Sequence, residues 1–475
     1  MDNSTIAALA TPGGRGGIGI IKISGPEAVS IAEDIFRPHH SNCDFGNIQR
    51  SELLENNNGH FQSHKLNYGQ IVDPETERAL DEVLVSVMKA PHTYTKEDVV
   101  EINAHGGAVA LQAILALVLR QGARLAEPGE FTKRAFLNGR IDLTQAEAVI
   151  DVVNARTEES LQIATAQIDG QLRNQIESIR KPLIHFLTHA EAVIDFPEDV
   201  DDIFDLRKTA IEVQKKVIGP LKMLIRNYMD AGVLRDGLKV AVVGKPNVGK
   251  SSLMNCLVQK DRAIVTSIPG TTRDVIEETV NIQGIPVVLS DTAGLHETDD
   301  PVETLGIEKT LKHVTGCDLV LFLIEAHRSL SDVDYQIYEK VKSKPLIIAI
   351  NKIDLVKQNR HRPIPEPWRE YEKVYTSALY GQGINSLKNK IVQLTTGENP
   401  IDLEEIIVPN LRQKVILERS IKAAEGMMAE IQNGTPIDLI AIDIQDAIDS
   451  LDEILGSNVK VDVLDQIFNQ FCIGK

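Results

Sequence analysis

Apolar runs of strand length and segments with helical periodicity divide this chain into four stretches. In residues 1–122, β-branched runs bounded by turn residues predict a small α+β domain. Its expected strands are residues 5–10, 20–24, 83–88 and 98–103. An apolar helix is expected over residues 107–121, and Gly122 is expected to end it.

Residues 123–236 and 398–475 have helical periodicity almost throughout. The first stretch predicts a helix over 131–138, a helix that begins with a capping box at Thr144–Glu147, a long segment over 158–194 interrupted by Gly170 and Pro182, and a helix that ends near Gly232. The second predicts helices over 409–432, 437–455 and 461–471. Because so short a helical stretch cannot easily bury a large core alone, it is predicted to complete the helical domain that precedes the insertion.

Residues 237–397 then form an inserted α/β domain. Its expected strands are residues 238–243, 275–282, 285–290, 318–324 and 346–350, with Gln283-Gly284 as a hairpin turn. The predicted fold class is therefore a multidomain α/β protein. It has an N-terminal α+β domain, a discontinuous helical domain and an inserted Ras-like P-loop domain, whose mixed sheet has helices on both faces.

Composition narrows the class of protein. The 475 residues are 43% hydrophobic, and the net charge is −18, from 50 basic and 68 acidic residues. This balance argues against a broad electrostatic surface for nucleic acid, although it leaves room for RNA on a local basic patch or on a partner. The four cysteines are dispersed, which suits a reducing compartment. No apolar run approaches membrane-spanning length and no signal peptide is evident, so a cytoplasmic protein without membrane contact is expected.

One glycine-rich stretch imitates a nucleotide motif. Gly14, Gly16 and Gly19 fit the dinucleotide-binding pattern G-x-G-x-x-G, which requires a helix directly afterwards. The β-branched run 20–24 follows instead, so these glycines are predicted to form a turn between strands.

A second glycine-rich stretch, Gly244–Ser251, fits the phosphate-loop pattern G-x-x-x-x-G-K-[ST] at every fixed position. It lies between an expected strand and an expected helix, as the pattern requires. Its backbone N–H groups and the positive end of the helix form a cradle for polyphosphate. Lys250 is expected to reach the β and γ phosphates, and Ser251 is expected to bind Mg²⁺.

Four further motifs follow in the order found in GTPases. Threonines in 266–274 offer a second Mg²⁺ ligand, assigned to Thr272, and Asp291 takes the Walker-B position. Asp354 can accept two hydrogen bonds from guanine, which adenine does not offer, and Ser377–Leu379 is expected to close the base pocket. The chain thus resembles a GTPase of the small-G-protein class, and its predicted GTP-binding residues are Asn247, Val248, Gly249, Lys250, Ser251, Ser252, Thr266, Ser267, Ile268, Pro269, Gly270, Thr271, Thr272, Asp291, Thr292, Ala293, Gly294, Asn351, Lys352, Asp354, Ser377, Ala378 and Leu379.

The chain departs from small G proteins at Leu295, where Ras-like enzymes place a glutamine that orients water. The combination of Leu295 with Asn247 and the run Pro269–Asp274 is similar to the potassium-activated GTPases, in which K⁺ performs the electrostatic role of an arginine finger. That resemblance assigns the K⁺ contacts to Asn247, Thr266, Ile268 and Thr271. For Asn247, a side chain that caps the local turn is the alternative.

The remaining signatures identify a family. Gly129–Asn138, Ala192–Pro197, Asp291–Leu295 and the terminal Phe471–Lys475, together with the inserted G domain, closely resemble the MnmE family, also called TrmE, of tRNA-modifying GTPases. The resemblance covers essentially the whole chain.

Several expectations follow from this resemblance alone. It implies a homodimer that joins the FAD protein MnmG in a heterotetramer and adds a carboxymethylaminomethyl, or aminomethyl-type, group to C5 of the wobble uridine (position 34) of certain tRNAs. It implies that 5-formyl- or methylene-tetrahydrofolate binds the N-terminal domain, which also dimerises. The folate contacts fall on Lys22, Glu101, Arg140 and Lys475. Other members carry arginine where this chain has Lys22, which replaces a two-pronged contact with a point charge.

Alternatives remain at several of these positions. Glu303 matches the acid that helps the family to position the attacking water, but an acid at a helix start also favours the helix dipole. Cys472 is a candidate nucleophile or a structural tail residue, and Glu101 a site residue or a solvated acid near a strand end. The acidic run 195–202 is a cation site or a solvated loop. At the level of the whole protein, a ribosome-assembly switch is the alternative to a tRNA-modifying enzyme.

Overall fold

The computed structural model describes residues 4–12, 14, 16–39, 61–196, 206–261, 277–291, 316–356, 365–396 and 406–475. The chain divides into two compact units, which are considered separately below. The first comprises residues 1–150 and 456–475, and the second comprises residues 151–455.

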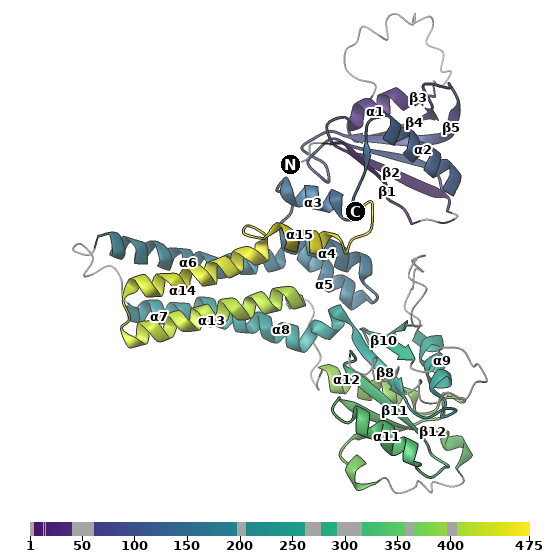
Figure 1. The fold of residues 1–475 in the computed structure, drawn as a ribbon, viewed down its shortest axis with the longest axis vertical. Coiled ribbons are helices and arrows are strands. Elements are labelled where there is room, and N and C mark those ends of the chain that lie inside the picture. Colours follow the sequence, from purple (N-terminus) through teal and green to yellow (C-terminus); the bar gives the residue numbers. More distant parts are fainter. Residues whose placement is uncertain are drawn as a thin grey trace, which may run out of the picture. The chain divides into compact units, whose positions relative to one another are not determined.

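A seven-stranded sheet forms the centre of the first unit, in the order β3-β4-β5-β6-β2-β1-β7 (Figure 1). Its neighbouring strands run antiparallel except β1 and β7, which run parallel. The strands are β1 (Ile6–Leu9), β2 (Ile18–Ser24), β3 (Phe36–Pro38), β4 (Lys65–Val72), β5 (Ala79–Met88), β6 (Val99–His105) and β7 (Arg124–Leu125). Because β1 and β2 pair directly, the prediction of a turn rather than a dinucleotide site between them is confirmed.

The two faces of this sheet differ in what covers them. Alternate residues such as Ile21, Val85 and Ile102 pack under α1 (Ala28–Ile35) and α2 (Ala108–Arg120). On the opposite face, next to β1, Phe131 of α3 (Glu130–Leu137) packs in a small cluster with Ile6 and Ala8. The rest of that face carries exposed apolar side chains, which matter for assembly below.

A small helical layer completes the first unit. The helices α3, α4 (Leu143–Asn154) and α15 (Val461–Phe468) share a cluster in which Leu143, Phe468 and Phe471 are buried. Lys133 of α3 also pairs with Asp465 of α15 at 2.6 Å. The end of the chain is thereby attached to a helix more than three hundred residues earlier in the sequence.

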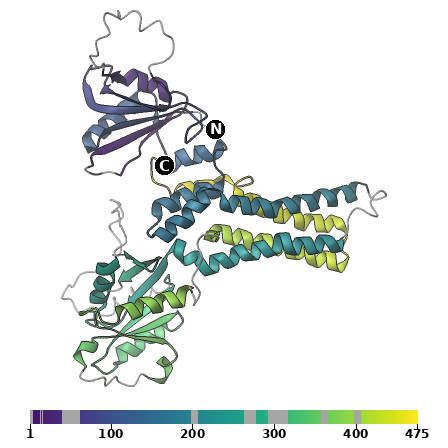
Figure 2. The same cartoon turned by 180° about the vertical axis from the view of Figure 1, so that it is seen from behind.

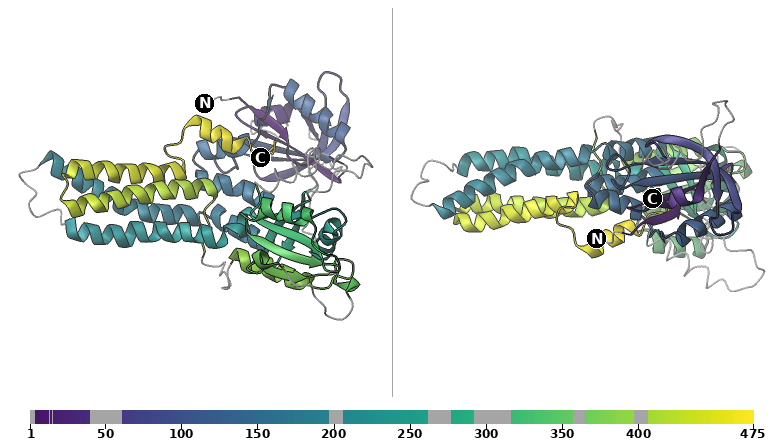
Figure 3. Two further views of the ribbon diagram at one scale, coloured as in Figure 1. Left: turned by 60° about the horizontal axis from the view of Figure 1, so that its bottom comes forward. Right: turned by 90° about the horizontal axis from the view of Figure 1, so that it is seen from above.

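The second unit contains a helical bundle (Figure 3). The helix α14 packs against α13 and α6, and α13 packs against α8. The helices of this part are α5 (Glu158–Ile168), α6 (Gln171–Asp195), α7 (Leu206–Val213), the π-helical turn η1 (Gln214–Ile218), α8 (Gly219–Asp236), α13 (Leu411–Asn433) and α14 (Ile437–Leu455). The apolar stripes of these helices, apart from α5, form one core, so segments on either side of the inserted α/β part stabilise each other. Ile163 of α5 packs instead in the core of the α/β part.

Two predicted helix boundaries are wrong. Asp142, not Thr144, caps α4, because its Oδ1 accepts hydrogen bonds from the backbone N–H groups of Thr144 and Gln145. Pro182 lies inside α6 instead of interrupting the helix. The helix tolerates the lost backbone hydrogen bond because the neighbouring Leu183 and Ile179 are fully buried in the bundle core.

The rest of the second unit is a six-stranded mixed sheet in the order β13-β12-β11-β8-β10-β9, with only β9 antiparallel to its neighbour (Figure 2). Its strands are β8 (Leu238–Val243), β9 (Glu277–Ile282), β10 (Ile285–Asp291), β11 (Leu319–Glu325), β12 (Leu346–Asn351) and β13 (Glu372–Tyr375). Its helices are α9 (Lys250–Asp261), α11 (Asp332–Val341) and α12 (Ile384–Thr396), with the 3₁₀ turns η2 (Ile353–Leu355) and η3 (Glu366–Trp368).

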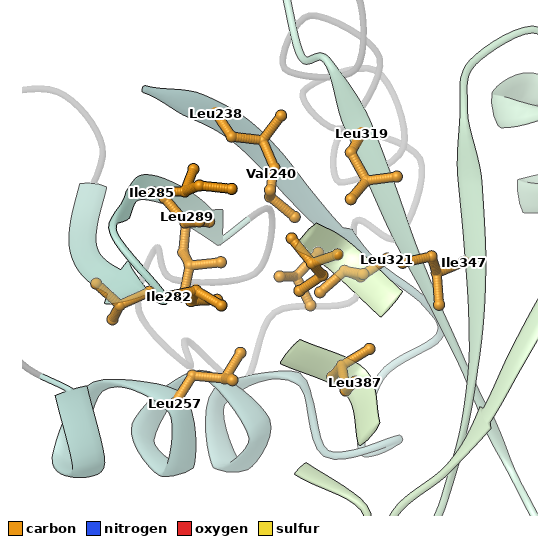
Figure 4. Close-up of a cluster of buried hydrophobic side chains, with 14 of the residues drawn as sticks. Leu238, Val240, Leu257, Ile282, Ile285, Leu289, Leu319, Leu321, Ile347 and Leu387 are labelled. Carbon is orange, nitrogen blue, oxygen red and sulfur yellow. The ribbon is translucent and has the colours of Figure 1, made fainter. Parts of the chain in front are cut away.

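Apolar side chains on both faces of this sheet explain why its central strands are continuously hydrophobic. Val240, Leu321 and Ile347 point to the face covered by α9 and α12, where Leu257 and Leu387 meet them (Figure 4). The alternate residues pack on the other face, with α11 and Trp368. The prediction of a mixed sheet with helices on both faces is therefore confirmed.

The predicted hairpin is also confirmed. Gln283 and Gly284 have φ of 53° and 88°, the left-handed pair that a tight two-residue turn requires. Seven helices and strands in the described residues were not predicted, apart from the short turns η2 and η3: α1, β3, β4, β7, α11, β13 and α12.

Candidate functional site

The loop between β8 and α9 contains two glycines that no other residue could replace without strain. Gly244 has φ of +155°, and an added Cβ would lie 2.6 Å from the carbonyl oxygen of Leu323. Gly249 has φ of +99°, and its added Cβ would lie 2.4 Å from Asn351 Nδ2. Glycine thus allows the loop to pass close to both β11 and the end of β12.

Lys250 begins α9 and extends back across this loop. Its side chain is buried, and Nζ donates to the carbonyl oxygens of Gly244 at 2.9 Å and Lys245 at 3.1 Å. The first N–H groups of a helix have no partner within the helix and carry its positive end. Ser251 and Ser252 are exposed at the same place. Cation, hydroxyls and helix start together make a site suited to a polyphosphate.

Asn351 connects three loops around this site. It is 1% exposed, at the end of β12. Its Nδ2 donates to the carbonyl oxygen of Val248 at 2.9 Å, and its Oδ1 accepts from the backbone N–H of Ala378 at 3.0 Å. Thr376 Oγ1 makes a longer contact with the same oxygen, at 3.4 Å. One amide side chain thereby fixes the spacing between the phosphate loop and the two loops after β12 and β13.

Asp354 and Lys352 lie directly beyond Asn351. The exposed carboxylate of Asp354 accepts a hydrogen bond from Ser377 Oγ at 2.5 Å. Lys352 has a left-handed φ of 64°, and its Nζ lies 2.5 Å from the carbonyl oxygen of Asn247 in the phosphate loop. The structure therefore brings the predicted residues of the base-binding and phosphate-binding motifs together. Leu379, in contrast, is 76% exposed.

Part of the predicted nucleotide site lies outside the described residues. Asp291 ends β10 beside Val242 of β8, so its backbone is at the predicted strand end, but its side chain is not described. The positions outside the description are Thr266, Ser267, Ile268, Pro269, Gly270, Thr271, Thr272, Thr292, Ala293, Gly294, Leu295 and Glu303.

A second group of predicted residues gathers on the N-terminal sheet. Lys22 and Glu101 are direct partners on β2 and β6, with Nζ 3.7 Å from Oε1. Lys22 Nζ lies 5.4 Å from the ring centre of Tyr94 and 5.5 Å from that of Phe131. The guanidinium of Arg140 lies 4.6 Å from the same tyrosine ring. Glu101 lies inside β6, so its prediction near a strand end is wrong by a few residues.

The charge of Lys22 is perturbed by these surroundings. Burial lowers its pKa below 10.5, Glu101 raises it, and Lys475 lowers it further through repulsion. The contribution from Lys475 means that the end of the chain lies close to this pair. Two of the predicted residues, Lys22 and Lys475, are therefore neighbouring cations, and only Lys22 is paired with Glu101, a combination suited to a ligand with negative charge.

Backbone hydrogen bonds attach the end of the chain to the start of α3. The N–H of Phe131 donates to the carbonyl oxygen of Lys475 at 3.2 Å, and the N–H of Gly129 donates to that of Cys472 at 3.4 Å. The side chain of Cys472 is exposed. Its backbone is attached to Gly129, the residue before α3.

A buried ion-pair network holds α3 in place. Glu130 accepts from Arg124 Nη1 at 2.8 Å and from Arg134 Nη2 at 3.0 Å, and Arg134 also pairs with Glu97 at 3.1 Å. Burial raises the pKa of Glu130, but the two guanidinium groups and the N–H of Glu127 lower it more, so the net shift is downward. The ionised network fixes α3, which carries Phe131 and precedes Arg140.

Sequence reasoning missed Tyr94, Phe131 and Glu325. Tyr94 lies between two cations, and its hydroxyl is 3.0 Å from Thr132 Oγ1. Nothing in its local sequence indicates this, because the residues that surround it come from β2, α3 and the segment after α3. Glu325 contacts the lysine of the base-binding motif and is considered separately below.

Other classes of site find little support. Of the acidic run 195–202, only Asp195 and Phe196 are described. Within the described ranges, no group of three or more potential metal-ligating side chains comes together. No helix in the described part of the chain is long and apolar enough to cross a membrane.

Known proteins are similar to this chain over almost its whole length. Residues 5–140 match the family model of the GTP-binding protein TrmE N-terminus, and residues 143–472 match that of the MnmE helical domain. The tRNA modification GTPase MnmE of Acetivibrio thermocellus is 46% identical over 473 residues, which is 99% of each chain. The protein of the same name from Bacillus licheniformis is 44% identical over 474 residues, 99% of this chain and 100% of that one. Among solved structures, Aquifex aeolicus Era bound to GDP and AlF4⁻ is 31% identical, with a TM-score of 0.28, over 40% of this chain and 67% of Era.

Proposed function

Because the chain belongs to the MnmE family of tRNA modification GTPases, we propose that its GTP hydrolysis drives the addition of a carboxymethylaminomethyl-type group to C5 of the wobble uridine of certain tRNAs. The observation that carries this proposal is the extent of the match. The two family models span residues 5–140 and 143–472, so both parts that flank the G domain belong to the same kind of protein.

The nucleotide chemistry is assigned to the loops around Asn351. Lys250 neutralises the β and γ phosphates, and Ser251 and Thr272 are the Mg²⁺ ligands, with Asp291 acting through water. Bound Mg²⁺ supplies charge stabilisation for the leaving phosphate. Asp354, oriented by Ser377 at 2.5 Å, accepts the two guanine N–H groups. An exposed acid that is already oriented supports a base-reading role.

K⁺ is proposed as an activator of hydrolysis. The proposed ligands are Asn247, Thr266, Ile268 and Thr271, and Glu303 is proposed to position the attacking water through a second water. In its support, the exposed Asn247 has a left-handed φ of 61°, with its backbone oxygen held by Lys352. Its side chain is therefore presented from a fixed backbone at the rim of the phosphate loop, and a neutral amide oxygen suits a monovalent cation.

Hydrolysis rates in equal concentrations of KCl and NaCl test this part. Faster hydrolysis in KCl is expected for the wild type, and Asn247→Ala is expected to lose that advantage while it retains nucleotide binding. Equal wild-type rates in the two salts would reject the K⁺ proposal.

The group around Tyr94 is proposed to bind a reduced folate, 5-formyl- or methylene-tetrahydrofolate, as the source of the one-carbon unit. Glu101 suits the amino-pyrimidine edge, and Lys22, Arg140 and Lys475 suit the glutamyl carboxylates. One acid and two side-chain cations around an aromatic ring fit a ligand that is itself aromatic at one end and anionic at the other.

Calorimetry with 5-formyl-tetrahydrofolate tests the folate site. Glu101→Ala is expected to weaken binding, whereas Glu75→Ala, at an exposed turn between β4 and β5, is expected to bind like the wild type. No heat of binding in the wild type contradicts the site.

A homodimer is proposed to form through the open face of the N-terminal sheet. Ile18, Leu66, Tyr68 and Leu84 lie on this face and are between 40% and 65% exposed. An apolar group of this kind on a sheet indicates an interface. Leu66→Glu is expected to yield monomers in sedimentation experiments, whereas Val109→Glu, on α2 and 81% exposed, is expected to leave dimers intact. Wild-type monomers, or a dimeric Leu66→Glu variant, contradict this interface.

The partner of this dimer is proposed to be the FAD protein MnmG, in a heterotetramer that acts on tRNA. Nucleoside mass spectrometry of tRNA from a strain that lacks the protein tests the whole proposal. Loss of the modified wobble uridine is expected. An unchanged nucleoside pool would reject tRNA modification and favour a switch that only times the association of other molecules.

A further inference from the structure

Glu325 is a buried acid that lies beneath the nucleotide site without belonging to any nucleotide-binding motif. It ends β11, and its side chain is 2% exposed. Three cations surround the carboxylate. Lys352 Nζ lies 2.5 Å from Oε1, Arg328 Nε lies 3.6 Å from Oε2, and Lys245 Nζ lies 3.9 Å from Oε2.

Of the three cations, Lys352 is the nearest to Glu325, and it also contacts the phosphate loop. Lys352 Nζ donates to Glu325 and also to the carbonyl oxygen of Asn247, each at 2.5 Å. Its backbone has a left-handed φ of 64°, a conformation that is unfavourable for a residue other than glycine. Neighbouring contacts must therefore hold the residue in this conformation. The ammonium group links the base-binding loop, which continues to Asp354, with the turn of the phosphate loop.

We propose that Glu325 is a positioning residue for nucleotide binding, which holds Lys352 between the base-binding loop and the turn of the phosphate loop at Asn247. It acts through Lys352 and does not touch the nucleotide. This role rests on the proposed assignment of the loops around Asn351 to guanine nucleotide binding, and it does not depend on the K⁺, folate or tRNA proposals.

Charge and burial support this role. Burial raises the pKa of Glu325, but the hydrogen bond and charge of Lys352, with Arg328 and His327, lower it more, so the carboxylate stays ionised. An ionised acceptor orients an ammonium group about twice as strongly as a neutral one.

The other two cations do not transmit the same constraint. Lys245 has a nearer carboxylate in Asp334, at 3.2 Å, so it keeps a partner when Glu325 changes. Arg328 is 66% exposed, and a pair of this kind contributes little. Lys352 contacts no other carboxylate within the described ranges, so it alone loses its ionic partner.

The first test compares Glu325→Gln with Arg328→Gln. Glutamine has nearly the same shape but removes the charge, and arginine 328 lies outside the nucleotide site. Stopped-flow measurement with fluorescently labelled GDP is expected to give a Kd about tenfold higher for Glu325→Gln, which is a loss of about 1.4 kcal/mol of binding free energy. The Kd of Arg328→Gln is expected to be unchanged. The KM for GTP is expected to rise more than kcat falls, because the residue positions the nucleotide without joining the reaction.

A double-mutant cycle separates positioning from a general loss of structure. If Glu325 acts through Lys352, adding Glu325→Gln to Lys352→Ala leaves the Kd of Lys352→Ala unchanged. Additive losses, or a wild-type Kd for Glu325→Gln, overturn the proposal. If Glu325→Gln fails to fold, Glu325→Asp replaces it, because aspartate keeps the charge but withdraws the carboxylate from Lys352 by one methylene. A wild-type Kd for Glu325→Asp also overturns the proposal.

Discussion

Replacing Asn351 by alanine is expected to break the contact between the phosphate loop and the base-binding loops. The change removes the side-chain hydrogen bonds to Val248 and Ala378, at 2.9 and 3.0 Å, and the longer contact with Thr376 at 3.4 Å. It introduces no bulk and leaves the backbone of β12 free to pair as before. The loss should therefore concentrate on the loops.

The magnitude follows from burial. Asn351 is 1% exposed, so water cannot readily replace the lost partners. Leaving a buried donor or acceptor unsatisfied costs about 1–3 kcal/mol each. With partial relaxation of two such groups, we expect a total of about 2–4 kcal/mol, divided between stability and nucleotide binding. If most of this free energy appears in binding, the Kd rises by about 30- to 1000-fold.

Fluorescent GDP titration and thermal unfolding of the same samples measure the two parts. Asn389→Ala is the matched control, because Asn389 is exposed and accepts its hydrogen bond from Gln283 at the surface, at 2.7 Å. The reasoning is refuted if Asn351→Ala binds GDP and unfolds like the Asn389→Ala control. A loss of stability without any loss of affinity would show that the loops keep their spacing by other contacts.

Three further outcomes are expected. Gly129 and Gly139 share a φ of +67°, but an added Cβ would lie 2.7 Å from the carbonyl oxygen of Phe468 at the first and 4.0 Å from its nearest described neighbour at the second. Gly129→Ala should therefore unfold at a lower temperature than Gly139→Ala, because it loses about 1–3 kcal/mol more of its free energy of unfolding. Equal losses would contradict the close contact between Gly129 and Phe468. Asp354→Asn should exchange preference for guanine for preference for xanthine nucleotides in competition binding, and retained GTP affinity would contradict the base assignment. Because burial lowers the pKa of Lys22 from 10.5, the unfolded chain binds more protons just below that pH, so the wild type should gain stability relative to Lys22→Met as pH rises toward 10.5. A difference in stability that stays constant with pH would argue against that shift.

Local chemistry explains why some elements could be predicted from the sequence. Two central strands of the inserted sheet, Leu319–Glu325 and Leu346–Asn351, are short runs that are apolar up to their last residue, because both faces are covered. The left-handed Gln283-Gly284 pair identifies its hairpin in the same direct way. These signals depend on a few neighbouring residues, so they survive without knowledge of the rest of the chain.

The wrong and missing predictions arise where the local sequence does not decide the structure by itself. Asp142 and Thr144 are both good helix caps, and the contacts of Asp142 with Thr144 and Gln145 decided between them. Pro182 disfavours a helix interior, but the bundle core that α6 enters outweighs that preference. Strands β4 and β13 carry mixed polar and apolar residues, so their pairing partners determine them more than their own composition does.

The sequence by itself determined the glycine-rich loop Gly244–Ser251 and its order relative to Asn351–Asp354, because the proposed phosphate and guanine contacts need fixed residue types at fixed spacing. Only the tertiary structure decided what surrounds Lys22 and Lys352. Tyr94 reaches Lys22 from outside its strand, and Glu325 reaches Lys352 from the neighbouring strand β11. The physical reason is that a contact between side chains far apart in the chain depends on strand register and burial. These are set by the packing of the whole domain, and no short stretch of residues encodes them.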